Sequence, residues 1–195
     1  MATNSISLLR KIFDDSINAH QRFTDLNLDL VVQAAEAVAH AVQTERKVVA
    51  FGNGGSATDA EHLVAELVGR FEEERYSLAG IALTANSAVV TAIGNDYGYE
   101  RVFARQIEGL GNAGDIAFGI STSGQSPNVR VALEAAKARG MITIALTGRD
   151  GGSIGRLVDI HLNVAESSTP RIQEVHRTVL HAMCTLIDES VRNSL

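Results

Sequence analysis

The sequence predicts an α/β fold: a doubly wound parallel sheet flanked by helices, with additional helices at the N-terminus. Two observations support this prediction. Short apolar or β-branched runs recur along the chain, and most of them are apolar throughout, which is typical of strands buried on both faces of a parallel sheet. Helical segments separate these runs, which gives the βαβ alternation of a doubly wound sheet.

The N-terminal segment shows the spacing of amphipathic helices. Its apolar side chains recur every three or four positions, which matches the helical period. They form two sets, which are Ile6, Leu9, Phe13 and Ile17, and then Val31, Ala34, Val38 and Val42. We therefore expect two helices within residues 1–45, as an N-terminal helical extension of the domain.

The rest of the chain alternates between expected strands and expected helices. The apolar runs lie at 47–51, 78–83, 115–120, 141–146 and 158–164, and the helical segments at 57–69, 127–139 and 170–193. The glycine-rich segment 148–153 is expected to be a surface turn. Because no repeat, low-complexity tract or linker divides the sequence, we expect residues 1–195 to form a single domain.

Composition narrows the class of protein. Of the 195 residues, 45% are hydrophobic and two are proline, which is a globular composition. The net charge is −6 and no lysine- or arginine-rich cluster occurs, so we expect neither a nucleic-acid nor a membrane partner. Cys184 is the single cysteine, and no apolar run approaches the roughly 18 residues of a membrane span. These features predict a cytoplasmic protein that binds small molecules or other proteins.

Two loops follow expected strands at the edge of the sheet where ligands bind in open α/β folds. The first is Gly52-Asn53-Gly54-Gly55-Ser56, whose glycines allow backbone N–H groups to approach a ligand closely. The second carries four hydroxyl side chains, those of Ser121, Thr122, Ser123 and Ser126, and leads into Pro127 at an expected helix start. Such a loop can bind phosphate without a lysine. Either loop alone can equally be a tight strand-to-helix turn.

Two helical segments carry groups that can bind a metal or transfer a proton. His62 and Glu66 are four residues apart, so they project from one helical face, as two ligands of one metal or as a solvated pair. In the last helix, Gln173, His176 and His181 interrupt an apolar face. Polar groups that enter a core need partners, and we expect His176 to be such a satisfied core side chain.

Five segments together resemble one protein family. They are "FGNGGSATDAEHLVAELVGRF", "TAIGNDYGYERVFARQ", "GDIAFGISTSGQSPNV", "ALTGRDGG" and "RIQEVHRTVLH". Taken as a set, they are similar to the sedoheptulose 7-phosphate isomerases, also called phosphoheptose isomerases, of the sugar-isomerase (SIS) domain superfamily. The resemblance extends from about residue 5 to the C-terminus, and it implies a flavodoxin-like SIS domain.

The resemblance also implies a reaction and a site. The family interconverts D-sedoheptulose 7-phosphate and D-glycero-D-manno-heptose 7-phosphate, the first step toward the heptoses of bacterial lipopolysaccharide. Its zinc ligands, one ion per subunit, correspond to His62, Glu66, Gln173 and His181. Its substrate contacts correspond to Asn53, Gly54, Gly55, Ser56, Asn95, Asp96, Ser121, Thr122, Ser123, Ser126 and Gln173. Glu66 and His181 are then the catalytic acid/base pair, and a homotetramer with active sites at subunit interfaces is expected.

The spacing of Gln173 and His181 leaves three arrangements open. Eight residues on a straight helix correspond to about 12 Å of rise and a turn of roughly 80°, near the limit for two ligands of one ion. The ion lies between them, the helix is distorted, or one ligand comes from a neighbouring subunit. A nitrogen bound to zinc also cannot take up a proton, so His181 cannot be ligand and base at once.

Two other functions remain open at this stage. Some SIS relatives associate with a bacterial replication initiator and lack the glutamate and the final histidine, both of which are present here as Glu66 and His181. Other SIS proteins sense sugar phosphates or isomerise a different sugar phosphate. Those proteins share the serine loop but not the set of four metal ligands.

Overall fold

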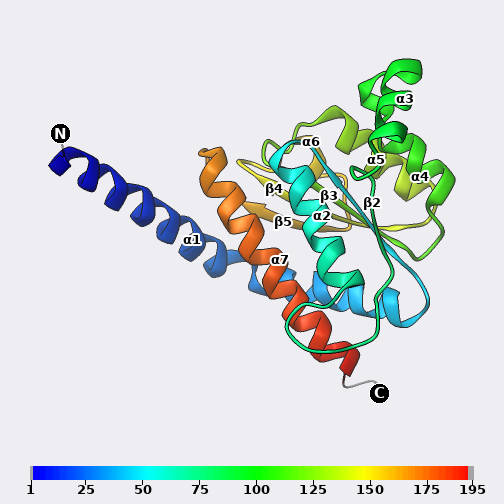
Figure 1. The fold of residues 1–195 in the computed structure, drawn as a ribbon, viewed down its shortest axis with the longest axis horizontal. Coiled ribbons are helices and arrows are strands. Elements are labelled where there is room, and N and C mark those ends of the chain that lie inside the picture. Colours follow the sequence, from blue (N-terminus) through cyan, green and yellow to red (C-terminus); the bar gives the residue numbers. More distant parts are fainter. Residues whose placement is uncertain (1, 193–195) are drawn as a thin grey trace.

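The fold is built on one parallel sheet, seen in the computed structural model, which describes residues 2–192 (Figure 1). Its five strands are ordered β2-β1-β3-β4-β5, and every neighbouring pair is parallel. The strands are β1 (Val48–Gly52), β2 (Gly80–Ala82), β3 (Ile116–Ser121), β4 (Ile142–Gly148) and β5 (Ile160–Val164). All five fall within the apolar runs or end one or two residues beyond them, so the predicted α/β fold class is confirmed.

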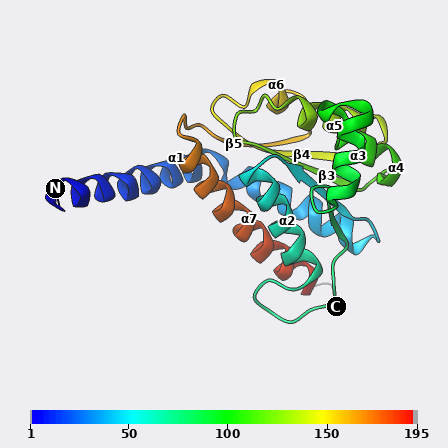
Figure 2. The ribbon, with the colours of Figure 1, turned by 45° about the horizontal axis from the view of Figure 1, so that its top comes forward.

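Helices cover both faces of the sheet, as the two views of the ribbon show (Figures 1 and 2). On one face lie α1 (Ala2–Gln43), α2 (Gly55–Val68) and α7 (Thr169–Arg192). On the other lie α3 (Ser87–Tyr97), η1 (Tyr99–Arg101), α4 (Ala104–Leu110), α5 (Pro127–Ala138) and α6 (Gly152–Gly155). None of the helices within residues 2–192 combines the length and apolar character needed to cross a membrane.

The three central strands, β1, β3 and β4, contribute side chains to two separate cores. Val48 and Ala50 of β1 belong to the core under α1, α2 and α7, whereas Val49 and Phe51 belong to the core under α4 and α5. This alternation follows from the two-residue period of a strand. Because both sets are fully buried, the strand must be apolar throughout, which is the pattern seen in the sequence.

The N-terminal segment differs from its prediction: α1 is one helix of 42 residues rather than two. Its first 43 residues contain neither glycine nor proline, so nothing in the backbone ends the helix. The buried face continues through Ala19, Phe23 and Asn27 to Val31 at four-residue spacing. A small and a polar residue in that series hid its continuity from an analysis of apolar spacing.

Two further segments differ from expectation. No element was expected between 84 and 114, yet α3, η1 and α4 lie there. Within α3 no residue is fully buried, and Val90 and Ile93 pack against the core only in part, so the apolar face by which a helix is recognised in sequence is weak. The glycine-rich segment 148–153 is only partly at the surface, since Gly151 and Gly152 are buried against the backbone of Gly124.

His176 is a core side chain, as expected, but it is incompletely satisfied. Its Nε2 lies 3.0 Å from the carbonyl oxygen of Thr147 in β4, which makes Nε2 the donor. Its Nδ1 is buried and finds no hydrogen-bond partner in the part of the chain that the structure describes. Burial lowers the pKa of His176 from 6.5 to about 4, because a charged imidazolium loses its hydration there.

We expect this histidine to make folding sensitive to acid. As the pH falls below 6.5, His176 binds a proton in the unfolded chain, whereas in the folded chain it stays neutral until about pH 4. The free energy of unfolding therefore decreases across that interval. At pH 5 the loss from this group is about 2 kcal/mol. Urea unfolding at pH 7.5 and pH 5, at fixed protein concentration, measures it. In His176→Gln the loss should be smaller by that amount, and an identical loss in both proteins would contradict the assignment.

Candidate active site

The candidate site lies where the direction in which successive strands are added to the sheet reverses. β1 pairs with β2 on one side and with β3 on the other, so the chain changes direction across the sheet after β2. In parallel sheets the crevice at such a switch point binds ligands beyond the carboxyl ends of the strands. The loops that leave β1 and β3 there are the glycine loop, residues 52–56, and the serine loop, residues 121–126. Both loops were predicted from the sequence.

A pair of amides joins the two loops. Asn53 donates to Oδ1 of Asn128 at 2.8 Å, and Asn128 donates to Oδ1 of Asn53 at 2.8 Å. Tyr99 of η1 also donates to Oδ1 of Asn53, at 3.1 Å. Asn128 is buried and was missed by the sequence analysis, because an asparagine in the first turn of a helix resembles an ordinary capping residue. The amide pair fixes the orientation of Asn53 at the rim of the crevice.

The serine loop gathers its hydroxyl groups. The Oγ of Ser121 lies 2.9 Å from that of Ser126 and 3.4 Å from that of Ser123. Ser126 is the N-cap residue of α5 and Pro127 its first residue, as predicted, but the Ser126 side chain makes no capping bond. Gly124, with a φ of +64°, lies against Gly151, where a Cβ atom would clash with the Gly151 carbonyl. The loop therefore holds three hydroxyls together at a helix N-terminus, an arrangement that suits a phosphate.

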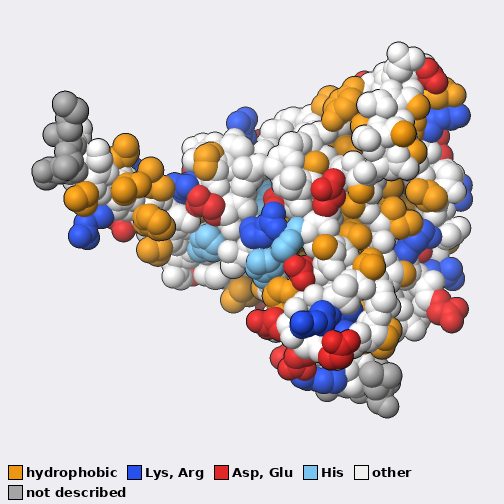
Figure 3. Space-filling model, in the orientation of Figure 1, with side chains coloured by type: hydrophobic (Ala, Val, Ile, Leu, Met, Phe, Trp, Pro, Cys, Tyr) orange, Lys and Arg blue, Asp and Glu red, His pale blue; other side chains and the backbone are white. Residues whose placement is uncertain are grey.

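A second cluster lies where α2 and α7 run side by side. The Nε2 atoms of His62 and His181 are 2.8 Å apart, and Nε2 of His62 is 3.3 Å from Oε1 of Glu66. The rings of Phe71 and His181 are in contact, with centroids 5.4 Å apart. Histidine side chains are visible at the surface in this region, with basic and acidic groups around them (Figure 3). His62 thus contacts both Glu66, which was predicted from its spacing, and His181, which was predicted from the family resemblance.

Charged neighbours tune this cluster. Burial is the main cause that lowers the pKa of His62, and Arg177 lowers it further, while Glu66 acts in the opposite direction. The neutral imidazole is therefore favoured, which is the form that binds a metal or accepts a proton. Asp59, one turn before His62, forms a 2.6 Å ion pair with Arg177 of α7. Burial raises the pKa of the Asp59 carboxyl and Arg177 opposes that rise.

Gln173 lies apart from this cluster. Its amide contacts Gly55 so closely that a Cβ atom on Gly55 would stand 2.2 Å from its Nε2. Both residues line an open pocket of about 560 Å³ among α1, α2 and α7, together with Pro170, Asp59 and Arg177. Since α7 is a continuous helix, Gln173 and His181 face α2 at different heights, with the Asp59–Arg177 ion pair between them.

Other predicted site residues take varied positions. Asn95 and Asp96 are exposed on α3, where the Asn95 amide donates to the Asp96 carboxylate at 2.8 Å. Gly54 is the N-cap residue of α2, with a φ of +57° that favours glycine. Ser56 is buried in the first turn of α2, and Thr122 is partly buried in the serine loop. Burial raises the pKa of Cys184 to about 12, so its thiol stays protonated near neutral pH.

The chemistry of the cluster can be compared with the needs of zinc. Zinc holds imidazole nitrogens at 2.0–2.1 Å in a tetrahedron, so two such ligands stand about 3.3 Å apart. His62 and His181 approach to 2.8 Å, and therefore a separation by about half an ångström would admit an ion. Within residues 2–192, no group of three or more His, Cys, Asp or Glu side chains is already arranged to hold one. The donor types fit zinc, although the two rings must first move apart.

Known proteins resemble the chain over nearly its full length. A family model described as SIS domain matches residues 12–148. The phosphoheptose isomerase of Neisseria gonorrhoeae is 50% identical over 179 residues, which cover 90% of this chain and 91% of that protein. The chain belongs to the phosphoheptose isomerase family. A phosphoheptose isomerase from Nitratiruptor is 57% identical over 150 residues, which cover 77% of this chain and 80% of the relative.

Solved phosphoheptose isomerases share the whole fold. The structure from Neisseria gonorrhoeae superposes with a TM-score of 0.89 at 46% identity, covering 94% of this chain and 98% of that one. The structure from Francisella tularensis gives a TM-score of 0.91 at 38% identity, covering 95% and 98%. Membership in the phosphoheptose isomerase family makes the protein an isomerase and confirms the resemblance seen in the sequence.

Proposed function

We propose that the protein interconverts D-sedoheptulose 7-phosphate and D-glycero-D-manno-heptose 7-phosphate, as the first step of heptose biosynthesis. The observation that carries the proposal is the contact of His62, Glu66 and His181 between α2 and α7, beside a crevice whose serine loop suits a phosphate. Aldose–ketose isomerisation needs an acid, a base and stabilisation of a negative oxygen. The relatives that cover the chain bear the name phosphoheptose isomerase.

The phosphate end of the substrate is assigned to the serine loop. Ser121, Ser123 and Ser126 present their hydroxyls at one place, where the N-terminus of α5 adds its positive dipole. Neutral donors of this kind bind a dianion without a lysine, which agrees with the net charge of −6. Held there, the sugar extends past the Asn53–Asn128 amide pair toward the second cluster, with Asn95 and Asp96 assigned to it as further substrate contacts.

The proton transfer is assigned to Glu66 and His181. The carboxylate removes a proton from the carbon next to the carbonyl, and the enediolate that results takes a proton at the neighbouring carbon. His181 serves the oxygen atoms, donating to one and accepting from the other as the carbonyl moves. His62 touches both partners, since its Nε2 lies 2.8 Å from His181 and 3.3 Å from Glu66. His62 therefore keeps the side chains of Glu66 and His181 in position relative to each other.

We further propose one zinc ion per subunit, with His62, Glu66, His181 and Gln173 as ligands. Zinc supplies a Lewis acid that stabilises negative charge on the substrate oxygens. Gln173 contacts Gly55 in a single chain, so its amide takes part only after a side-chain or helix movement, or from a neighbouring subunit. A nitrogen that coordinates zinc cannot bind a proton, so His181 performs one of its two roles at a time.

The competing function is that of a non-catalytic SIS protein that binds another protein. Such a protein needs no proton-transfer pair, whereas Glu66 and His181 lie together here through His62. The discriminating experiment incubates the purified protein with sedoheptulose 7-phosphate and follows the aldose by NMR, with and without a chelator. An isomerase with zinc produces the aldose and loses activity with the chelator.

Substitution of the proposed base gives the first prediction. Glu66→Gln should fold like the parent, because Glu66 is partly exposed and packs little, but its kcat should fall by about 10²–10⁴-fold. Glu61→Gln, an exposed change on the same helix, is the matched control and should keep full activity. Near-normal kcat in Glu66→Gln, with circular dichroism unchanged, would remove the acid/base assignment.

Substitution in the serine loop gives the second prediction. Ser121→Ala and Ser123→Ala should each weaken substrate binding by about 1–3 kcal/mol, since each removes a hydrogen bond to a charged group. Inorganic phosphate should compete with the substrate in the parent protein. Steady-state kinetics measures both effects, with the exposed Ser87→Ala on α3 as control. An unchanged KM in both loop variants and no inhibition by phosphate would place the phosphate site elsewhere.

We also propose a homotetramer whose interface includes α1. The N-terminal half of this helix extends away from the sheet and carries exposed apolar side chains (Figures 1 and 3). They are Ile6, Leu8, Leu9, Ile12, Phe13 and Ile17, with exposed fractions from 36% to 68%. An apolar stripe of this length on an isolated projection needs a partner surface. Closed symmetry of four identical chains supplies one, and it also brings neighbouring residues toward each crevice.

The assembly prediction follows from this stripe. Light scattering of the parent should give the mass of four 20.8 kDa chains. The double substitution Phe13→Asp with Ile17→Asp places charges on the stripe and should shift the protein to smaller species. Asp14→Ala, an exposed polar change between them, should leave the tetramer intact. A parent monomer would exclude the tetramer, and an unchanged mass in the double variant would place the interface elsewhere.

A further inference from the structure

Arg75 connects the two helices that carry the His62 cluster. It lies in the segment 69–79 that follows α2, and its side chain is 8% exposed. Its Nε donates to Oδ1 of Asp188 in α7 at 2.6 Å. Its Nη2 donates to the carbonyl oxygen of Glu66 at 2.7 Å, and its Nη1 to that of Leu67 at 2.9 Å. One guanidinium group is therefore bonded to the end of α2 and to the side of α7.

These bonds reach acceptors at the end of α2, where the carbonyl oxygen of Leu67 also accepts from the backbone N–H of Leu78 at 3.0 Å. The last carbonyl groups of a helix lack partners within it, and a positive charge is favourable at that end. The planar fork of arginine reaches two such carbonyls and a carboxylate at once, which lysine cannot do. Oδ2 of Asp188 is buried without a hydrogen-bond partner among residues 2–192, so within that part of the chain Arg75 alone balances this carboxylate.

The position of these bonds relates them to the proposed chemistry. Glu66 takes part in both places: its backbone carbonyl accepts from Arg75, and its carboxylate approaches His62. Asp188 follows His181 by seven residues, which is about two turns, so both project from the same face of α7. Phe71, in the same segment as Arg75, packs its ring against the ring of His181. Arg75 thus acts on the backbone of the base and on the helix of its partner.

We propose that Arg75 is a positioning residue, which with Asp188 sets the spacing between α2 and α7 that holds Glu66 and His181 in register. The inference rests on the proposed function of those two residues. The Asp59–Arg177 ion pair joins the same two helices on the other side of the cluster. Loss of Arg75 should therefore change the spacing of the helices without separating them, which distinguishes a positioning role from a role in fold stability alone. Without Arg75 the helices stay attached there, and the cluster opens at the Glu66 end.

The test uses Arg75→Lys, which keeps the charge but loses the fork. We expect kcat to fall by about 10- to 100-fold, because small misplacements of reacting groups are that costly, while KM changes by less than about 2-fold. Zinc affinity, measured by competition with a fluorescent chelator, should fall by about 10-fold or more, since the proposed ligands on α2 and α7 no longer lie at the same spacing. This second readout needs no turnover.

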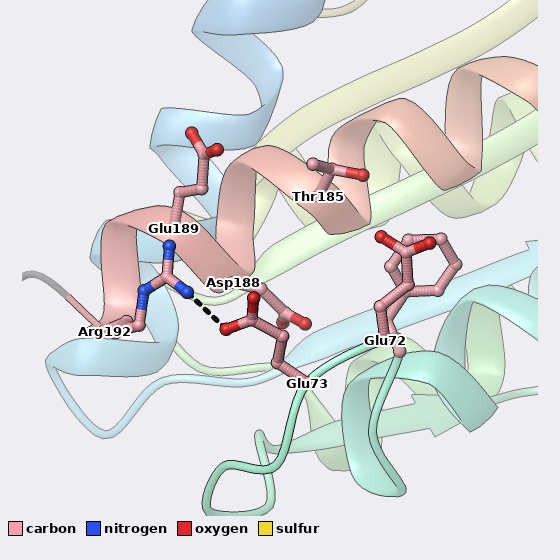
Figure 4. A pocket seen from close by; sticks show the side chains of 7 residues that line it. Glu72, Glu73, Thr185, Asp188, Glu189 and Arg192 are labelled. Carbon is pink, nitrogen blue, oxygen red and sulfur yellow. Dashed lines mark hydrogen bonds and ion pairs between the residues drawn. The ribbon is translucent and has the colours of Figure 1, made fainter.

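The control is a surface ion pair that also joins the segment 69–79 to α7. Glu73 and Arg192 form an ion pair at the surface, one turn beyond Asp188, and Figure 4 shows it beside Asp188 in an acidic pocket. Both side chains are more than half exposed, so Arg192→Met should leave kcat and zinc affinity unchanged. If Arg75→Lys fails to fold, the double variant Arg75→Met with Asp188→Leu removes both charges and carries the same expectations.

The outcomes separate the two proposals. A parent protein that leaves sedoheptulose 7-phosphate unchanged contradicts the proposed function, and zinc competition then tests the positioning role without turnover. An active parent whose folded Arg75 variants keep the parental kcat and zinc affinity, with only a lower melting temperature, overturns the positioning role. A loss of kcat at constant KM together with weaker zinc binding, absent from Arg192→Met, establishes it.

Discussion

The packing of α2 against α7 is the constraint on which the candidate site depends. Both helices bury apolar side chains in the core on one face of the sheet, among them Leu63 of α2 and Leu180 of α7. Burial of that kind fixes the two helices side by side, and the polar residues at their line of contact must then meet each other. His62 meets His181 there, between the Asp59–Arg177 pair and the bonds of Arg75. Packing of the apolar core thereby brings the polar side chains of the His62 cluster together.

The topology of the sheet connects that cluster to the phosphate-type loop. Because β1 stands between β2 and β3, the loops after β1 and β3 leave the sheet side by side, and Asn53 and Asn128 join them. The helix that follows the first loop is α2 itself, which carries His62 two turns later. In the proposed function, the serine loop binds the phosphate and the sugar extends from there toward the proton-transfer pair on α2 and α7.

Sequence patterns predicted what depends on local chemistry. Buried strands are apolar on both faces, and helix starts use serine and proline, so the sheet and the serine loop were found. The unbroken helix α1 was missed because Ala19 and Asn27 continue its buried face without strong apolar character. Asn128 and Arg75 were missed because their partners are 75 and 113 residues away in the chain. The separation of Gln173 from His181 followed from their spacing along one helix, whereas the approach of the Gln173 amide to Gly55 needed the packing of α7 against α2.

The most direct test of the account is isomerisation in D2O. If the Glu66–His181 pair transfers protons through an enediolate, the carbon that receives a proton takes deuterium from the solvent through the acid/base groups. After equilibration with sedoheptulose 7-phosphate, proton NMR and mass spectrometry should show one deuterium at C2 of the aldose. Aldose that forms without any deuterium, even after many turnovers, would mean direct hydride transfer between the carbons and would contradict a proton-transfer site between α2 and α7.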